Sequence, residues 1–564
     1  MNKPWKTALA LSALLMSHAP RLLACGCFAP PSPATPVVQA GERILFAQDG
    51  ANVTAYIQLQ YQGAAADFGW LVPLPSVPTL EVGSDELFTQ LLATTSPSYV
   101  LSTTRDFCGG GSSTSVGCGG ATSLNSAGSA TSADAGAFVS DAGTSSGSPL
   151  VLSSSIGPYD YAVLKADNKT TMLDWLTANH YYVPDATGTA VTPYIHPGAY
   201  FLALKLASGE AAGNVVPIVL RYESDLPMVP ITLTQVGAIP DMGILVWLLG
   251  DARAIPRNYY SVVLDEMPVW NDVTTYPAAA IRAVHDAPKR HAFLTEYAGP
   301  SSVMANQLDY PGRFGNLAQA RTLTNPYDYL GFLRYNGFTY DSTLFAILEK
   351  YVPEPASAIA QGVSEAQYYA SAYQYLSPEA LDAGTTPFDA GALTDEITSR
   401  IVVPDQQASK LFSSYPYLTR MYTALSPADM NVDPVFSQNP DLPEVPLVHS
   451  AQLTYPCEGD AWLRTDSGEE AQFLSGTLRT SKTLPGALRV ETLREEGPPL
   501  VVTDNSASIT AALGKVSHGS SPDSSSHGAG SGCDVRSRFP RSAAGTALLV
   551  AGAIYLSRRR RKVA

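Results

Sequence analysis

Apolar and polar residues alternate along the first half of the chain with the period of two that β-strands require. Every second residue of NVTAYIQLQYQ is apolar, from Val53 to Tyr61. The run RILFAQ comes just before it, and Asp49-Gly50 supplies a tight turn between them, so the two runs are predicted to form a hairpin. Further strands are predicted in FGWLVPLP, PYDYAVLKA, AYFLALKLA, VVPIVLRYE, MVPITLT, GILVWLLG and NYYSVVLDE.

Two predicted helices interrupt these strands. SDELFTQLLATTSP has Ser84 as its N-cap, and TTMLDWLTANHYYVP is amphipathic and stops before Pro184. Beyond about residue 270 the apolar spacing changes to three and four, which is typical of helices. The helical segments are TYPAAAIRAVHDA, TLFAILEKYV, SEAQYYASAYQYL and SKLFSSYPYLTRMYTAL. The pattern predicts an α+β fold with a β-rich N-terminal half, a mainly helical C-terminal half and a small β-rich region near the end.

Composition changes mark the predicted boundaries. Residues 108–149 are almost entirely Gly, Ser, Ala and Thr, which cannot bury enough apolar surface to fold. We therefore expect a signal peptide (1–24), a β-rich part (25–107 and 150–270), a flexible insert (108–149), a mainly helical part (271–445), a small β-rich region (446–513), a flexible spacer (514–542), a transmembrane or sorting helix (543–557) and a basic cytoplasmic tail (558–564).

Overall composition narrows the class of protein. Of the 564 residues, 45% are apolar and 15% are charged, so the chain can bury a sizeable core in two or three domains. The formal net charge of −15 would repel a phosphate backbone, and we therefore expect no nucleic-acid partner.

The N-terminus has the pattern of an export signal. Lys3 and Lys6 form a basic segment, and residues 7–16 (TALALSALLM) form an apolar one. Cleavage near Ala24 by an ordinary signal peptidase fits this pattern. The sequence LLAC is also similar to a lipobox, which would make Cys25 a lipidated first residue.

The C-terminus has the pattern of a membrane segment. Residues 543–556 are apolar and would span about 21 Å as a helix, less than the roughly 30 Å of a bilayer core. The basic cluster after them should lie in the cytoplasm and leave the body of the chain outside. That cluster consists of Arg558, Arg559, Arg560, Arg561 and Lys562. A permanent anchor and a processed tag both fit this tail.

The chain has six cysteines, and export permits disulfides. Cys108 and Cys118 flank a glycine-rich stretch and are the best candidates for a local disulfide. A bridge between Cys27 and Cys457 follows only by elimination. Cys25 and Cys533 are candidates for processing or lipidation. The spacing matches no zinc motif, so neither a metal nor a cofactor is expected.

The motifs of the common hydrolases and nucleotide-binding proteins do not occur. There is no HExxH, phosphate loop or GxGxxG before a helix, and no GxSxG nucleophile elbow; the letters GxSxG occur at residues 143–147, but inside the Gly/Ser/Ala/Thr insert, where no strand-to-helix turn is predicted. His285, Asp286 and His291 lie in HDAPKRH, where solvated or capping roles are expected. Asp429 and Asp433 could offer carboxylates to a cation, although capping and turn formation explain them more simply. Paired tyrosines, such as Tyr368-Tyr369, are expected to pack helices and strands together.

Several blocks resemble an exported bacterial family catalogued as domain of unknown function 2330. They are ACGCF, GERILFAQDGANVTAYIQLQYQG, DFGWLVPLP, GPYDYAVLKAD, YFLALKLASG and YPYLTRMYTALSPADMNVDPVFSQNPDLPEV, and they cover most of residues 25–445. The resemblance implies export but no activity, ligand or catalytic residue. The family's N-terminal cysteine motif appears here as Cys25-Gly26-Cys27.

The tail resembles myxobacterial C-terminal sorting signals, in which a cysteine precedes an apolar helix and an arginine cluster. In this chain Cys533 takes the place of that cysteine, although four charged residues separate it from the apolar run. The sequence as a whole favours an envelope-tethered, non-catalytic module that either binds a protein, polysaccharide or other envelope component or serves a structural role. An extracytoplasmic hydrolase whose site is assembled only in the folded chain is the alternative.

Overall fold

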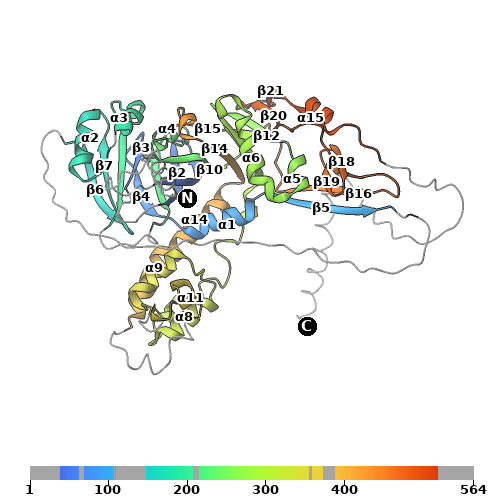
Figure 1. The fold of residues 1–564 in the computed structure, drawn as a ribbon. Coiled ribbons are helices and arrows are strands. Elements are labelled where there is room, and N and C mark those ends of the chain that lie inside the picture. Colours follow the sequence, from blue (N-terminus) through green and yellow to red (C-terminus); the bar gives the residue numbers. More distant parts are fainter. Residues whose placement is uncertain are drawn as a thin grey trace, which may run out of the picture. The chain divides into compact units, whose positions relative to one another are not determined.

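The computed structural model describes residues 38–62, 69–106, 108, 148–181, 183, 185–207, 215–354, 359–371 and 388–518 (Figure 1). All of them belong to one compact unit, residues 1–519. Within these ranges, every helix is too short or too polar to cross a membrane.

The largest sheet among the described residues has ten strands and draws on segments from both ends of the chain. Most neighbours pair antiparallel, and β1–β10 and β12–β13 pair parallel. In spatial order the strands are β21 (Leu500–Asp504), β20 (Ala487–Thr492), β12 (Tyr260–Leu264), β13 (Ala292–Pro300), β14 (Tyr417–Leu425), β10 (Ala238–Gly250), β1 (Val38–Asp49), β2 (Asn52–Gln62), β9 (Ile218–Glu223) and β4 (Thr79–Val82).

The predicted hairpin is confirmed as β1 and β2. Asp49 pairs with Asn52, and Gly50 adopts a φ of 57°, a conformation that glycine reaches without steric cost. The alternating apolar residues of both strands face a four-stranded antiparallel sheet, and the side chains between the two sheets form the largest core cluster. The strands of this sheet, in spatial order, are β3 (Gly69–Leu74), β8 (Tyr200–Leu206), β7 (Tyr159–Lys165) and β6 (Leu150–Ile156).

Two smaller sheets complete the β-structure of the described residues. In the five-stranded sheet, β5 pairs parallel with β16, so that Tyr99 lies beside His449. Its order is β19 (Thr477–Leu478), β18 (Glu470–Leu474), β17 (Ala461–Thr465), β16 (Val448–Tyr455) and β5 (Ser98–Arg105). The two-stranded sheet pairs β11 (Arg253–Pro256) with β15 (Phe436–Asn439).

Helices connect these sheets and form a separate hydrophobic cluster. The predicted N-cap of α1 (Asp85–Thr95) is confirmed, because the Ser84 side chain accepts from the Leu87 backbone N–H. Helices α2 (Lys169–Ala178), α3 (Asp185–Ala190), α4 (Ile231–Thr234), α5 (Met267–Asn271), α6 (Tyr276–His285) and α15 (Ser506–Leu513) lie between strands or after them. The cluster is formed mainly by α7 (Leu317–Ala320), α8 (Pro326–Tyr335), α9 (Ser342–Tyr351), α11 (Glu365–Ala370) and α13 (Ala390–Ile397), and α14 (Val403–Ser414) follows it.

The helix predicted over residues 409–425 is wrong in its second half. Helix α14 ends at Ser414, and Tyr417 begins β14 in the middle of the largest sheet. Pro416 disfavours helical backbone at the residue before it, and Tyr415 is accordingly extended, with φ −114° and ψ 126°. Because β14 lies between β10 and β13, its residues are mostly buried on both faces and show no simple alternation.

The strand predicted in MVPITLT is also wrong, because residues 231–234 form the short helix α4. The β-rich N-terminal half is confirmed. The C-terminal half is helical only in part, since β13, β14 and β15 lie among its helices.

Candidate functional site

A polar cavity of about 600 Å³ lies where β12, β13 and β20 meet the starts of β5 and β16. Its lining combines aromatic rings with charged groups of both signs. The side chains that give it this character are Tyr99, Arg253, Glu266, Tyr276, Glu296, Glu444, His449, Arg489 and Glu491.

Glu296 reaches the cavity through an irregularity in β13. Thr295 pairs with Met421 and Tyr297 pairs with Arg420, which leaves Glu296 as an extra residue between two paired positions. Such a β-bulge redirects one side chain without ending the strand. The bulge therefore explains how an acidic residue in an otherwise apolar strand comes to line a polar cavity.

Glu296 is held by two donors. The Arg420 Nε donates to its Oε2 at 2.6 Å, and the Tyr276 hydroxyl donates to its Oε1 at 2.5 Å. Arg420 also donates to the hydroxyl oxygens of Thr95 at 3.2 Å and Ser96 at 3.0 Å. Burial, followed by the neighbouring Glu296 carboxylate, raises the pKa of Tyr276. The phenol therefore stays protonated and remains a donor.

A stacked aromatic pair forms another part of the lining. The rings of Tyr99 and His449 lie 4.9 Å apart at an interplanar angle of 17°. His449 Nδ1 lies 2.6 Å from Glu266 Oε1, and the Trp270 ring meets Tyr99 edge-on at 5.0 Å. Burial raises the pKa of Tyr99. The stack is thus fixed in orientation by a carboxylate on one side and an indole on the other.

Two arginines supply donors to the cavity. Arg253 donates to the Pro443 carbonyl at 2.9 Å, while its Nε is buried without a hydrogen-bond partner among the described residues. Burial lowers the pKa of Arg253. Arg489 Nε donates to the buried Glu491 at 2.8 Å. The cavity therefore presents fixed acceptors and at least one unused donor side by side.

The structure corrects the expected disulfide. Cys108 is bonded to Cys457, with a Cα–Cα distance of 5.3 Å and a sequence separation of 349 positions. The two cysteines follow the parallel pair β5–β16, in which Arg105 lies opposite Tyr455. The pairings of Cys108 with Cys118 and of Cys27 with Cys457 are therefore wrong, because each sulfur forms one disulfide.

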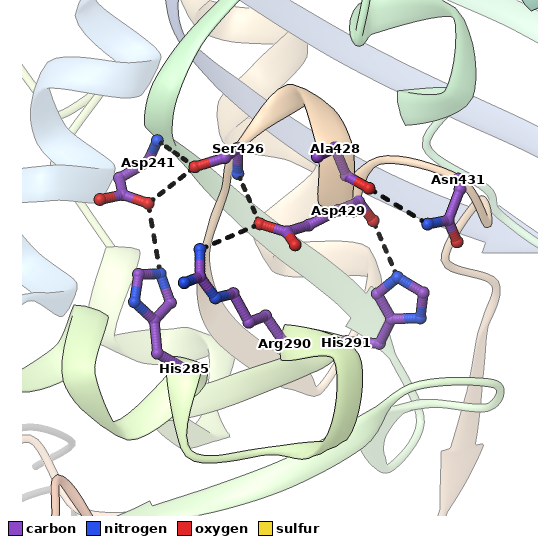
Figure 2. A network of polar contacts seen from close by, with 8 residues as sticks. All are labelled: Asp241, His285, Arg290, His291, Ser426, Ala428, Asp429 and Asn431. Carbon is purple, nitrogen blue, oxygen red and sulfur yellow. Dashed lines mark hydrogen bonds and ion pairs between the residues drawn. The ribbon is translucent and has the colours of Figure 1, made fainter.

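The two histidines of HDAPKRH lie in one polar network with Asp241, Ser426 and Asp429 (Figure 2). His285 Nε2 lies 3.3 Å from Asp241 Oδ1, and His291 Nε2 lies 2.8 Å from the Asp429 carbonyl oxygen. Because a carbonyl can only accept, the proton of His291 is on Nε2. At 7% exposure and stacked on Tyr259, His291 is buried rather than solvated.

The network does not have the order of a nucleophilic triad. The Ser426 hydroxyl donates to Asp241 Oδ1 at 2.9 Å, and His285 contacts the same oxygen, so the serine and the histidine share one carboxylate (Figure 2). A triad requires the histidine to lie between the serine and the carboxylate. Neither His285 nor His291 lines the polar cavity.

The other candidate residues have structural roles. Asp429 caps the turn at Ser426, accepting from its backbone N–H at 3.2 Å, which confirms the capping interpretation. Asp433 accepts from the Thr232 N–H and the Tyr194 hydroxyl. Tyr368 and Tyr369 are fully buried and pack in the helical cluster, as expected. The described ranges contain no group of three His, Cys, Asp or Glu side chains arranged to hold a metal ion.

The remaining candidates lie outside the described residues. They are Cys25, Cys118, Cys533, Arg558, Arg559, Arg560, Arg561 and Lys562.

Sequence reasoning missed the residues of the polar cavity. Glu296 interrupts the apolar run AFLTEYAG and Arg420 interrupts YLTRMYTAL. Charged residues are almost never fully buried unless they are paired, so a charge inside an apolar strand is the signal that could have found them. At Arg420 this signal could not be recognised, because the apolar residues around it are spaced as in a helix and the segment was predicted to be one.

Comparison of the sequence with known protein families gives a match to one family model. The model of a family described as uncharacterized protein conserved in bacteria (DUF2330) matches residues 20–300. Residues 20–300 of the chain belong to this family. No curated protein and no solved structure matches the chain.

The DUF2330 segment supplies only part of the cavity. Tyr99, Arg253, Glu266 and Glu296 lie inside the matched residues. The residues beyond the match include His449, Arg489 and the whole of β14, which carries Arg420. A DUF2330 segment ending at residue 300 would therefore lack the partner of Glu296.

Proposed function

We propose that this chain is an exported, envelope-tethered bacterial protein that binds a carbohydrate segment in the polar cavity without catalysing a reaction. The observation that carries the proposal is the composition of the cavity lining. A stacked Tyr99–His449 pair offers a rigid aromatic surface, and charged groups of both signs surround it.

A polyhydroxylated ligand fits this lining better than a charged one. Each sugar hydroxyl both donates and accepts, so it is satisfied where carboxylates and guanidinium groups alternate. An anionic polymer would meet four carboxylates, and a cationic one would meet Arg253 and Arg489. The carboxylates belong to Glu266, Glu296, Glu444 and Glu491. Charge-assisted hydrogen bonds from groups already held in place cost little ordering entropy.

We propose that the protein does not catalyse a reaction because most carboxylates that line the polar cavity are held in ion pairs. Glu296 is paired with Arg420, Glu266 with His449 and Glu491 with Arg489, which leaves Glu444 as the one described lining carboxylate without an ion pair. Glycoside hydrolysis needs one carboxyl group free to deliver a proton and a second free to activate water or attack. The alternative of a hydrolase receives no support from the Ser426 network, where the order of a triad is not met.

A glycan array followed by calorimetry tests the binding proposal. Purified full-length protein is applied to an array of bacterial surface oligosaccharides, and each hit is titrated with wild type and Tyr99→Ala. We expect Tyr99→Ala to weaken binding at least about tenfold, because buried aromatic residues carry much of the energy of an interface. Tyr335→Ala is the matched control, since Tyr335 is 93% exposed in α8 and does not line the cavity.

Two results would contradict the proposal. The first is an array without hits, and the second is a hit that Tyr99→Ala binds as tightly as wild type. Mass spectrometry of each hit after incubation with the protein separates binding from hydrolysis, because a shortened oligosaccharide would establish catalysis.

The location of the protein is proposed from the two ends of the sequence and is supported by the Cys108–Cys457 disulfide. Disulfides persist mainly in extracytoplasmic compartments. Cells expressing wild type, Cys533→Ala and a chain ending at Ser542 are to be fractionated. Release by truncation together with no effect of Cys533→Ala would support a simple anchor over a processed tag. Mass spectrometry of the mature N-terminus distinguishes cleavage after Ala24 from lipidation of Cys25.

A further inference from the structure

A second cavity lies between the largest sheet and the four-stranded sheet. It holds about 170 Å³, slightly more than an engineered cavity of about 150 Å³ that binds benzene. Ile44, Phe46 and Ile57 line it from β1 and β2, while Trp70 and Val72 line it from β3. We call it the inter-sheet cavity.

The inter-sheet cavity is rich in aromatic rings and contains one acidic group. Its lining includes Glu42, which follows a β-bulge between Gln39 and Gly41 and is 4% exposed. Gln39 Nε2 donates to Glu42 Oε2 at 3.2 Å. Because the Gln39 amide is neutral, it does not balance the charge of an ionised Glu42. None of the described lining residues is lysine or arginine. The aromatic residues of the lining are Phe46, Trp70, Tyr194, Tyr200 and Tyr222.

Trp70 adds an unused donor. Its side chain is 2% exposed, and its Nε1 has no hydrogen-bond partner among the described residues. A buried N–H without an acceptor costs free energy that a ligand oxygen would recover. The lining residues His196 and Pro75 are exposed, so the cavity reaches the surface at their end.

We propose that the inter-sheet cavity binds a small organic ammonium ion that also carries a hydroxyl or carbonyl oxygen. The cation lies against the aromatic faces, which attract positive charge through their quadrupoles, and beside the Glu42 carboxylate. The ligand oxygen accepts from Trp70 Nε1. Among the described lining residues there are five aromatic rings, one carboxyl group and no lysine or arginine, which distinguishes this site from a cavity for a neutral or acidic ligand.

Binding of a cation favours the ionised form of Glu42. Because burial raises the pKa of Glu42 to about 7, the carboxyl group of the free protein is largely protonated at pH 6 and largely ionised at pH 8. Affinity should therefore rise about tenfold between these two pH values. The other titratable groups that line the cavity are His196, Tyr194, Tyr200 and Tyr222. His196→Gln removes the one base among them and controls for its charge.

Calorimetry with choline and its neutral isostere 3,3-dimethylbutan-1-ol tests the proposal on the full-length protein. At pH 8 we expect choline to bind at least about tenfold more tightly than the alcohol. Glu42→Gln should remove most of this preference and the dependence on pH, while His196→Gln should keep both. Trp70→Phe should weaken choline about threefold more than it weakens tetramethylammonium, which has no oxygen to accept from Nε1.

Three outcomes would overturn the proposal. They are no binding of choline at either pH, equal binding of choline and the alcohol, and a pH dependence that persists in Glu42→Gln. Thermal unfolding of each variant at pH 5, where Glu42 is protonated, establishes that the substituted proteins are folded.

Discussion

Arg420 and Glu296 form a buried ion pair with an Nε–Oε2 distance of 2.6 Å behind the polar cavity. The two residues belong to adjacent strands, β14 and β13, and the bulge in β13 is what turns Glu296 toward the cavity. The Arg420 guanidinium also lies 5.4 Å from the centre of the Trp247 ring. The pair therefore links the core of the largest sheet to the lining of the candidate site.

Removing one partner of this pair should be strongly destabilising. We expect Arg420→Met to lower the free energy of unfolding by about 3–5 kcal/mol, because Glu296 would keep an uncompensated buried charge. Urea denaturation followed by circular dichroism measures the loss. The double variant Arg420→Met/Glu296→Gln should recover part of it, since the remaining charge is removed.

An exposed pair provides the matched control. Arg321 and Asp395 form an exposed pair, so Arg321→Met should lower the free energy of unfolding far less than Arg420→Met does. Equal losses for Arg321→Met and Arg420→Met would show that burial of the Arg420–Glu296 pair does not matter.

The Tyr276 hydroxyl should contribute to the stability of the folded protein. Tyr276→Phe keeps the ring but removes the hydrogen bond to Glu296 Oε1, and we expect a loss of about 1–3 kcal/mol because a buried carboxylate oxygen loses its donor. The same denaturation experiment measures it. Tyr335→Phe, at a side chain that is 93% exposed, should leave the free energy of unfolding unchanged.

The Cys108–Cys457 disulfide should stabilise the five-stranded sheet at the ends of β5 and β16. We expect Cys108→Ser or Cys457→Ser to lower the free energy of unfolding by about 2–4 kcal/mol, mainly because the unfolded chain becomes less constrained. The double variant Cys108→Ser/Cys457→Ser should lose no more free energy of unfolding than either single variant. Cys118→Ser is the control and should have no effect. A non-reducing peptide map that linked Cys108 to Cys118 would refute the assignment.

Local signals in the sequence predicted those parts of the fold that depend on neighbouring residues. Ser84 caps α1 and Asp49-Gly50 turns the first hairpin, because capping and turn geometry are settled within four residues. Residues 417–425 were not predicted, because a strand buried on both faces lacks the alternation that identifies strands.

The candidate site could not be predicted for a different reason. The position of Glu296 depends on the register between β13 and β14, whose paired residues are more than 100 positions apart in sequence. The partner of Cys108 likewise follows from the parallel pairing of β5 with β16, and six cysteines alone do not determine connectivity. Composition and spacing do not contain this long-range information.

Glu42 should make stability depend on pH. Burial raises its pKa from 4.5 to about 7 in the folded protein, so between these values the folded chain holds a proton that the unfolded chain has released. The free energy of unfolding therefore falls as the pH rises through this window. The full loss from Glu42 is about 3 kcal/mol and is complete above pH 7.

Comparison with Glu42→Gln isolates this contribution. Other buried acids, including Asp265, Asp341 and Asp405, also have pKa values raised to about 7, but they titrate in both proteins and cancel in the difference. We expect wild type and Glu42→Gln to differ by up to about 3 kcal/mol more at pH 8 than at pH 4.5, with the variant gaining relative to wild type. Denaturation curves at several pH values measure this difference. A constant difference would mean that Glu42 has an ordinary pKa in the folded protein, and the tenfold change in choline affinity between pH 6 and 8 would then not be expected either.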